Sequence, residues 1–140
     1  MIPRLGRNMI SFLLNNEYKN IDNAKADLTL LEYLRNQQGL TGTKEGCASG
    51  DCGACTVVLA EVVTNNNATS KQLEYRTINS CVTFLSALQG KQLITVEHIP
   101  DGKTLHPVQQ SLVEHHGSQC GFCTPGFIMS MFALYQQSAS

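Results

Sequence analysis

The sequence predicts an α+β fold. Strand-like patterns surround one short helical pattern in residues 9–98, whereas helical patterns without strands follow residue 99. A length of 140 residues suits one ordinary domain or two small ones. We therefore expect two units, residues 1–98 and 99–140, with all strands in the first. The patterns alone do not say how the strands are ordered in a sheet.

The first elements are predicted to be a hairpin and a helix, preceded by an extension at residues 1–8. Large apolar side chains alternate along residues 10–14, and Asn15-Asn16 favours a turn that returns the chain along residues 17–21. Thr29-Leu30-Leu31-Glu32 is a capping-box pattern, in which Thr29 starts a helix that runs to about Gln37. The helix residues expected to face the core are Leu30, Leu31 and Leu34.

Three further strands are expected in the first unit. Residues 56–63 are β-branched and apolar nearly throughout, which favours a strand covered on both faces. After a polar loop at residues 65–70, residues 72–76 alternate strictly, so one face of that strand should be wet. Residues 93–96 form the last predicted strand.

The second unit is predicted to be helical. Pro100-Asp101-Gly102 favours a turn, and Pro107 opens a helix that ends before Gly117. Thr124-Pro125 opens another helix that runs toward Gln136. The apolar stripe expected on this last helix consists of Phe127, Ile128, Met131, Leu134 and Tyr135.

Three cysteines gather in the glycine-rich stretch of residues 42–55. Cys47, Cys52 and Cys55 have C-x4-C-x2-C spacing, and Cys81 follows after the intervening strands. This is the plant-type ligand pattern of a 2Fe–2S cluster, in which each iron takes two thiolates besides the bridging sulfides. The glycines that would let the backbone fold tightly and point N–H groups at sulfur are Gly46, Gly50 and Gly53.

Cys81 is predicted to begin a short helix. Asn79 or Ser80 can cap that helix, and its partial positive charge would favour the Cys81 thiolate. Three alternatives to a cluster remain for the four cysteines: packing as small apolar residues, a disulfide framework, or a structural zinc site. Zinc sites usually pair two C-x2-C knuckles, a pattern that the isolated Cys81 does not follow.

A second cysteine pair, Cys120-Gly121-Phe122-Cys123, lies between the two predicted tail helices. By itself this pair is compatible with a redox dithiol, half a zinc site or half a cluster site. Phe122 is expected to pack rather than react. His115-His116, near a helix end, is expected to stabilise the helix terminus rather than to bind metal.

Composition limits which partners and which cellular compartment we expect for the chain. The net charge of −1 and the 15% of charged residues give no basic surface for nucleic acid. The apolar run at residues 9–14 is too short for a signal peptide or a membrane span. Six cysteines without a secretory signal indicate cofactor ligands in a reducing compartment, so we expect a cytoplasmic protein.

The ordered motifs resemble the iron–sulfur part of the xanthine dehydrogenase/aldehyde oxidase family of molybdenum hydroxylases. The resemblance is carried by residues 42–57, 78–81 and 119–126 and covers nearly the whole chain from residue 9. Lys44-Glu45 ahead of Cys47 is most similar to xanthine dehydrogenase. The resemblance implies a β-grasp, plant-type ferredoxin-like domain, followed by the first helices of an incomplete helical-bundle cluster domain.

The same resemblance implies roles for the second motif. Cys120 and Cys123 would be half of a second 2Fe–2S site, completed by a later C-x-C that is absent before Ser140, and Gln119 would lie beside the molybdenum pterin. We therefore expect a piece of a longer polypeptide. The incomplete bundle should leave the apolar stripe open for self-association or for docking to the first unit.

The implied function is electron transfer. Single electrons would pass from a molybdenum centre that hydroxylates a purine or aldehyde, through both clusters, to FAD, so the partners would be molybdenum- and FAD-binding domains or subunits. This chain would carry no substrate chemistry of its own. The alternatives are a free-standing 2Fe–2S ferredoxin, the small subunit of another molybdenum hydroxylase, or a structural zinc-binding module.

Overall fold

A computed structural model describes residues 9–67 and 70–139 of the chain. The expected extension at residues 1–8 and part of the expected loop at 65–70 lie outside the described residues. The strands are β1 (Ile10–Leu14), β2 (Glu17–Ile21), β3 (Thr56–Thr64), β4 (Lys71–Asn79) and β5 (Gln92–Ile94). The helical elements are α1 (Leu30–Glu32), the π-helical η1 (Tyr33–Gln37), the 3-10 helices η2 (Leu85–Leu88) and η3 (Val96–His98), α2 (Pro107–Glu114) and α3 (Thr124–Ser138).

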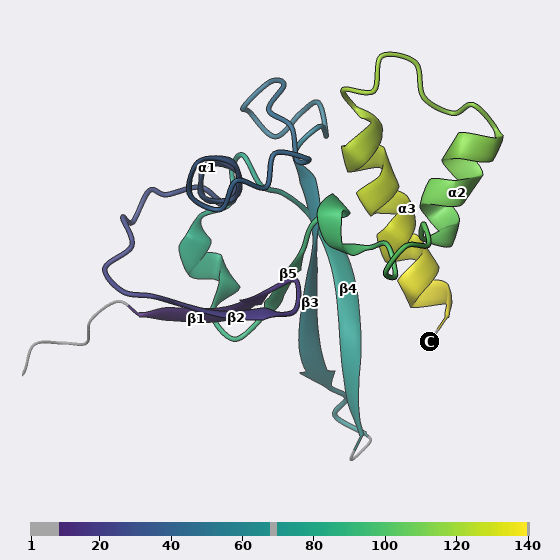
Figure 1. Cartoon of the computed structure of the whole chain (residues 1–140). Coiled ribbons are helices and arrows are strands. Elements are labelled where there is room, and N and C mark those ends of the chain that lie inside the picture. Colours follow the sequence, from purple (N-terminus) through teal and green to yellow (C-terminus); the bar gives the residue numbers. More distant parts are fainter. Residues whose placement is uncertain (1–8, 68–69, 140) are drawn as a thin grey trace, which may run out of the picture.

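The strands form one mixed sheet in the order β2-β1-β5-β3-β4. β1 and β5 are parallel, whereas the β1–β2, β3–β4 and β3–β5 pairs are antiparallel. The sheet lies between α1 with η1 on one side and α2 with α3 on the other (Figure 1). This arrangement is a ferredoxin-like β-grasp fold followed by a helical region, which confirms the predicted α+β class. The division of the chain at residue 98 stays a prediction.

One core lies between the sheet and the helix that follows Thr29. Thr29 Oγ1 accepts the backbone N–H of Glu32 at 3.2 Å, which confirms the predicted N-cap. After its first turn the helix widens to π geometry: the N–H of Gln38 donates to the carbonyl of Tyr33, five residues earlier. Leu30, Leu31 and Leu34 are buried as expected, and Phe12 packs edge-to-face on Tyr33.

A second core lies on the opposite face of the sheet, under α3. Val57 and Leu59 of β3 enter the first core, whereas Val58 and Ala60 enter the second. The expectation that this strand is covered on both faces is therefore confirmed for its first half. Beyond Glu61 the side chains of β3 are alternately exposed.

The apolar stripe expected on the last helix is largely uncovered, as expected for an incomplete bundle, and it is not the face that packs on the sheet. Phe127, Leu134 and Tyr135 are exposed, and Ile128 and Met131 are only partly buried. α3 packs on the sheet through Met129, Phe132 and Ala133, whereas Gly126 meets the cysteine loop at Gly53. Apolar side chains lie on nearly every side of α3, so the sequence pattern did not identify the face that packs on the sheet.

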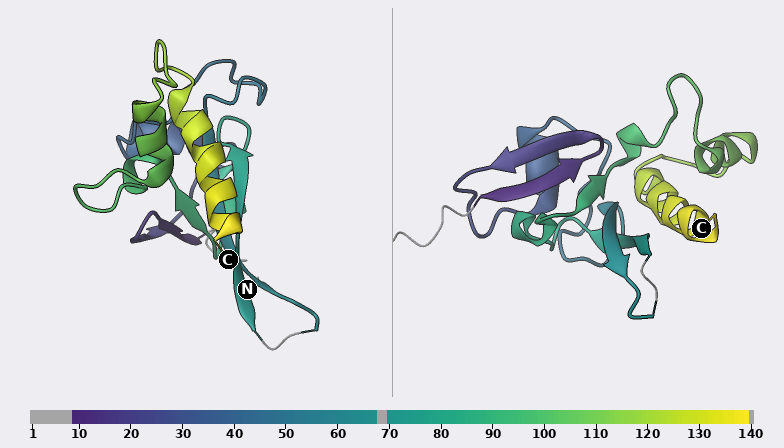
Figure 2. Two further views of the ribbon diagram at one scale, coloured as in Figure 1. Left: turned by 90° about the vertical axis from the view of Figure 1, so that its right-hand side faces the viewer. Right: turned by 90° about the horizontal axis from the view of Figure 1, so that it is seen from below.

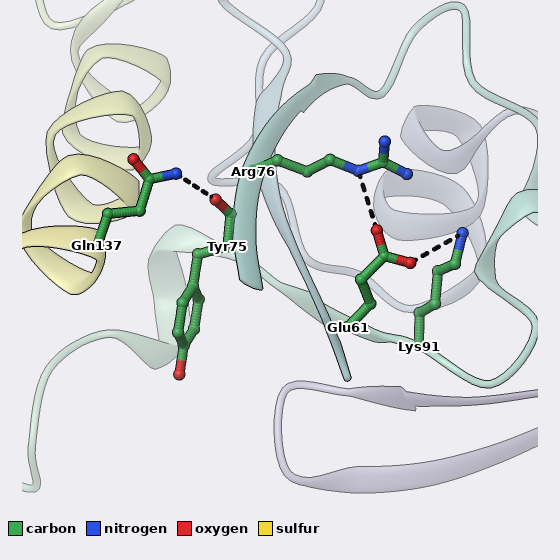
Figure 3. A network of polar contacts seen from close by, with 5 residues as sticks. All are labelled: Glu61, Tyr75, Arg76, Lys91 and Gln137. Atoms are coloured by element: carbon green, nitrogen blue, oxygen red, sulfur yellow. Dashed lines mark hydrogen bonds and ion pairs between the residues drawn. The ribbon is translucent and has the colours of Figure 1, made fainter. Parts of the chain in front are cut away.

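α3 runs beside β3 and β4 in both views of Figure 2, and its far end is tied to the sheet. Gln137 Nε2 donates to the carbonyl oxygen of Tyr75 on the edge strand β4 at 2.6 Å (Figure 3). On the other side of the β3–β4 pair, Arg76 and Lys91 each lie 3.6 Å from a carboxylate oxygen of Glu61. No helix within residues 9–67 and 70–139 is long and apolar enough to cross a membrane.

Candidate metal centre

The first cysteine loop connects η1 to β3, and its start is held by side chains of η1 and η3. Arg35 Nη1 donates to the carbonyls of Thr41 at 2.8 Å and Thr43 at 2.9 Å. The N–H of Gly42 donates to Glu97 Oε1 at 2.7 Å, so the loop is also tied to η3. The sequence analysis singled out neither Arg35 nor Glu97, because no motif marks a charged side chain that bonds to the backbone of a loop.

Backbone N–H groups converge on two of the sulfurs, as predicted. Cys47 Sγ accepts from the N–H groups of Ser49, Asp51 and Cys52 at 3.4, 3.3 and 3.2 Å. Cys52 Sγ accepts from those of Cys47 at 3.4 Å and Ala54 at 3.5 Å. Donors aimed at sulfur stabilise a thiolate and lower the negative charge that a bound cluster would present.

Glycine is required at two points of this loop for different reasons. A Cβ on Gly46 would lie 2.7 Å from Cys52 Sγ, so any side chain there would displace the sulfur. Gly53 has a φ of +76°, in the left-handed region that other residues adopt at a cost. The loop can therefore wrap its sulfurs closely only with glycine at these positions.

Cys81 does not begin a helix, so that prediction is wrong. It lies in a turn after β4, and the next helical element among the described residues is η2. The two residues expected to cap the helix are used elsewhere: Ser80 Oγ donates to the carbonyl of Cys55 at 2.6 Å, and Asn79 Nδ2 to that of Gly50 at 3.0 Å. These two side chains join the Cys81 turn to the cysteine loop.

The pKa values of the thiols show how the site is polarised. Hydrogen bonds from Ser49 and from the backbone of Cys52 lower the pKa of Cys47 to about 6. Burial, followed by a hydrogen bond with Cys55, raises the pKa of Cys81 to about 11, and the charges of Cys55 and Cys47 add to the increase. Cys81 thus lies among the other thiols, where four thiolates would repel one another without a cation between them.

Four cysteine thiolates are the donor set that a 2Fe–2S cluster takes, with two on each iron besides the bridging sulfides. Within the described residues, no group of three His, Cys, Asp or Glu side chains is arranged to hold a single metal ion. Cys55 is buried, whereas Cys47 and Cys52 are exposed, so the loop faces solvent on one side.

The second cysteine motif is less enclosed. Cys120, Cys123 and the neighbouring Gln119 are all exposed, in the segment that leads into α3. Both cysteine segments lie at the same end of the molecule, at the top of Figure 1. The ring of Phe122 reaches the first loop, where a Cβ on Gly46 would lie 3.6 Å from Cε1 of that ring. This is the packing role expected of Phe122.

One of the two histidines, His115, lies at the helix terminus, as predicted. His115 is the C-cap of α2, and its Nδ1 lies 2.9 Å from the carbonyl oxygen of Ser111. Its ring therefore satisfies a carbonyl at the helix terminus.

Two family models match the chain. A model described as a 2Fe-2S iron-sulfur cluster binding domain matches residues 13–86, and one described as a 2Fe-2S binding domain matches residues 95–140. Together with the cysteine geometry, these matches define the class of iron–sulfur proteins with two 2Fe–2S-binding domains.

Relatives narrow the class. Xanthine dehydrogenase of Emericella nidulans is 51% identical over 125 residues, which are 89% of this chain and 9% of that protein. Xanthine dehydrogenase 1 of Arabidopsis thaliana is 51% identical over 114 residues, or 81% of this chain and 8% of that protein. The chain thus spans less than a tenth of the curated relatives that it matches.

Solved structures agree with these relatives. Quinoline 2-oxidoreductase from Pseudomonas putida 86 superposes with a TM-score of 0.72 at 32% identity, covering 90% of this chain and 68% of that one. Aldehyde oxidoreductase from Desulfovibrio gigas superposes with a TM-score of 0.77 at 36% identity, covering 94% and 13%. The chain belongs to the xanthine dehydrogenase/aldehyde oxidoreductase family, as its iron–sulfur part.

Proposed function

We propose that the chain is the electron-transfer module of a molybdenum hydroxylase similar to xanthine dehydrogenase. One observation carries the proposal: two cysteine motifs meet at one end of the fold, and one of them already aims backbone N–H groups at its sulfurs. Cys47, Cys52, Cys55 and Cys81 would bind one complete cluster. Cys120 and Cys123 would supply half of a second site. Each bound cluster would store one electron at a time.

The protein would bind the cluster, shield it from water and adjust its reduction potential. The N–H donors on Cys47 and Cys52 favour the more negative, reduced state, and the burial of Cys55 keeps water from one side. Cys47, which is exposed and does not line the space shared with Cys123, supports an exit toward an FAD-binding partner. The exposed Gln119 beside Cys120 supports a contact with the pterin of a molybdenum-binding partner.

The direction and setting follow from the chemistry of such enzymes. Hydroxylation of a purine or aldehyde releases two electrons, which would leave the molybdenum centre singly, pass the Cys120/Cys123 site and then the Cys47-to-Cys81 site, and reach FAD. Six cysteines, none in a disulfide among the described residues, support a reducing cytoplasmic compartment. Neither a substrate site nor a nucleic-acid surface is assigned to this chain.

The test uses the intact protein with its molybdenum and flavin centres. Cys81→Ala should remove the first cluster and stop FAD reduction by substrate, while substrate still reduces the molybdenum centre in a single turnover. His115→Ala, at a helix end outside both motifs, is the matched control. FAD reduction at the wild-type rate in Cys81→Ala would exclude the proposed relay.

A further inference from the structure

We propose that Gly126 sets the separation of the two cysteine sites, as a positioning residue for electron transfer between them. The inference rests on the proposed function. Gly126 lies in the first turn of α3, three residues after Cys123, and is buried. It faces Gly53, which directly follows Cys52.

The approach at Gly126 is closer than any side chain permits. A Cβ on Gly126 would lie well inside 3.0 Å of the Gly53 carbonyl oxygen, 3.2 Å from the Gly53 carbonyl carbon and 3.4 Å from the carbonyl carbon of Ala54. All three neighbours are backbone atoms, so no rotamer change relieves the clash. Even alanine must push α3, and Cys123 with it, away from the first loop.

The loop itself cannot retreat easily. The carbonyl of Gly53 also accepts the hydroxyl of Thr56 at 2.8 Å and the Thr56 N–H at 3.2 Å. Thr56 begins β3, whose next residues are fully buried. The helix is therefore the part that moves when Gly126 gains a side chain.

The two motifs also share one cavity. A space of about 330 Å³ between the loop and the start of α3 is lined by Cys52 and Cys123, together with Thr56, Thr124 and Ser130. Cys52 and Cys123 are thus the cysteines of the two motifs that line the space between them. Gly126 and Gly53 also line this space, and their backbones make the first contact between the two motifs. Phe122, which lies against Gly46, makes the second contact.

The experiment measures separation directly. When both clusters of the intact protein are reduced with dithionite, their magnetic interaction splits the EPR signals, and the splitting falls with the cube of their distance. Gly126→Ala should weaken the splitting and slow electron transfer between the sites several-fold, with iron content unchanged. Met129→Ala is the matched control, because it loosens the same helix face without touching Gly53.

A second variant covers a folding failure of Gly126→Ala. Phe122 is 48% exposed, so Phe122→Ala removes the other contact between the motifs with little loss of core. It should give a smaller decrease in splitting. Wild-type splitting in both variants overturns the inference, as does an equal loss in Met129→Ala. A wild-type protein whose iron content shows a single cluster overturns the proposed function itself, and is distinguished by that analysis.

Discussion

The two cysteine segments occupy the same end of the molecule but differ in how far the fold prepares them. In the first, backbone N–H groups donate to sulfur, Cys55 is buried, and Asn79 and Ser80 donate to carbonyls of the loop. Around the second, no hydrogen bond reaches either sulfur from the described residues, and both thiols are exposed. The first loop is organised by hydrogen bonds within the fold, whereas the fold leaves the thiols of the second motif open to solvent.

Different interactions hold the two cysteine segments in place. The first loop is closed by bonds between residues far apart in sequence, such as Gly42 with Glu97 and Ser80 with Cys55. The second segment is placed by the packing of α3 on the sheet. Damage to ligands should therefore destroy the first site, while damage to helix packing should displace the second.

The largest effect is expected from a ligand of the first loop. Cys52→Ala in the 140-residue chain should lose nearly all cluster iron and melt at a markedly lower temperature, because metal-binding energy is folding energy. Cys123→Ala should keep the iron of the first site. Iron analysis, visible absorption and thermal melting provide the measurements. Full iron and an unchanged spectrum in Cys52→Ala would mean that the ligands are misassigned.

A smaller loss is expected from steric damage to the same loop. Gly46→Ala places a methyl group against Cys52 Sγ, so cluster incorporation should fall although every ligand remains. Gly39→Ala is the matched control: its φ of +67° makes alanine cost roughly 1–2 kcal/mol, yet nothing lies within 4 Å. Equal iron content in the two variants would show that the loop tolerates a side chain at residue 46.

The uncovered side of α3 predicts weak self-association. Phe127 is 58% exposed and Leu134 66%, and burying each would contribute roughly 1.5–3 kcal/mol. We expect the 140-residue chain to form dimers or larger species, and Phe127→Ser with Leu134→Ser to return it to a monomer, as measured by light scattering. A chain stopped at residue 98 is no matched control, because it uncovers Val58 and Ala60. A monomeric wild-type chain would contradict this prediction.

The smallest effect concerns acid sensitivity of the helical part. Burial lowers the pKa of His106, whose neutral Nδ1 accepts the N–H of Val108 at the start of α2. The unfolded chain therefore binds a proton first as pH falls, so stability is full above about 6.5 and declines below it. His106→Asn retains a cap but does not titrate. Thermal melts from pH 7.5 to 5 should show a smaller decline in this variant; parallel curves would exclude the role.

Local patterns predicted much of this molecule from the sequence. The hairpin, the Thr29 cap and the N–H donors around Cys47 all depend on residues within a few positions of one another. The turn at Cys81 was missed because Asn79 and Ser80 bond to carbonyls 29 and 25 residues away instead of capping a helix. The face of α3 that packs on the sheet was not identified, because apolar side chains lie on nearly every side of the helix.

The parallel pairing of β1 with β5 has a consequence for assembly. Leu13 pairs with Gln92, and Asn15 Oδ1 accepts the N–H of Thr95, so the sheet closes only when segments some 80 residues apart meet. Such nonlocal closure slows folding. Because Glu97, which anchors the start of the cysteine loop, lies beyond this closure, a chain leaving the ribosome must complete β5 before the loop is held. Metal should therefore bind only after β5 has joined the sheet and the cysteine loop has been anchored.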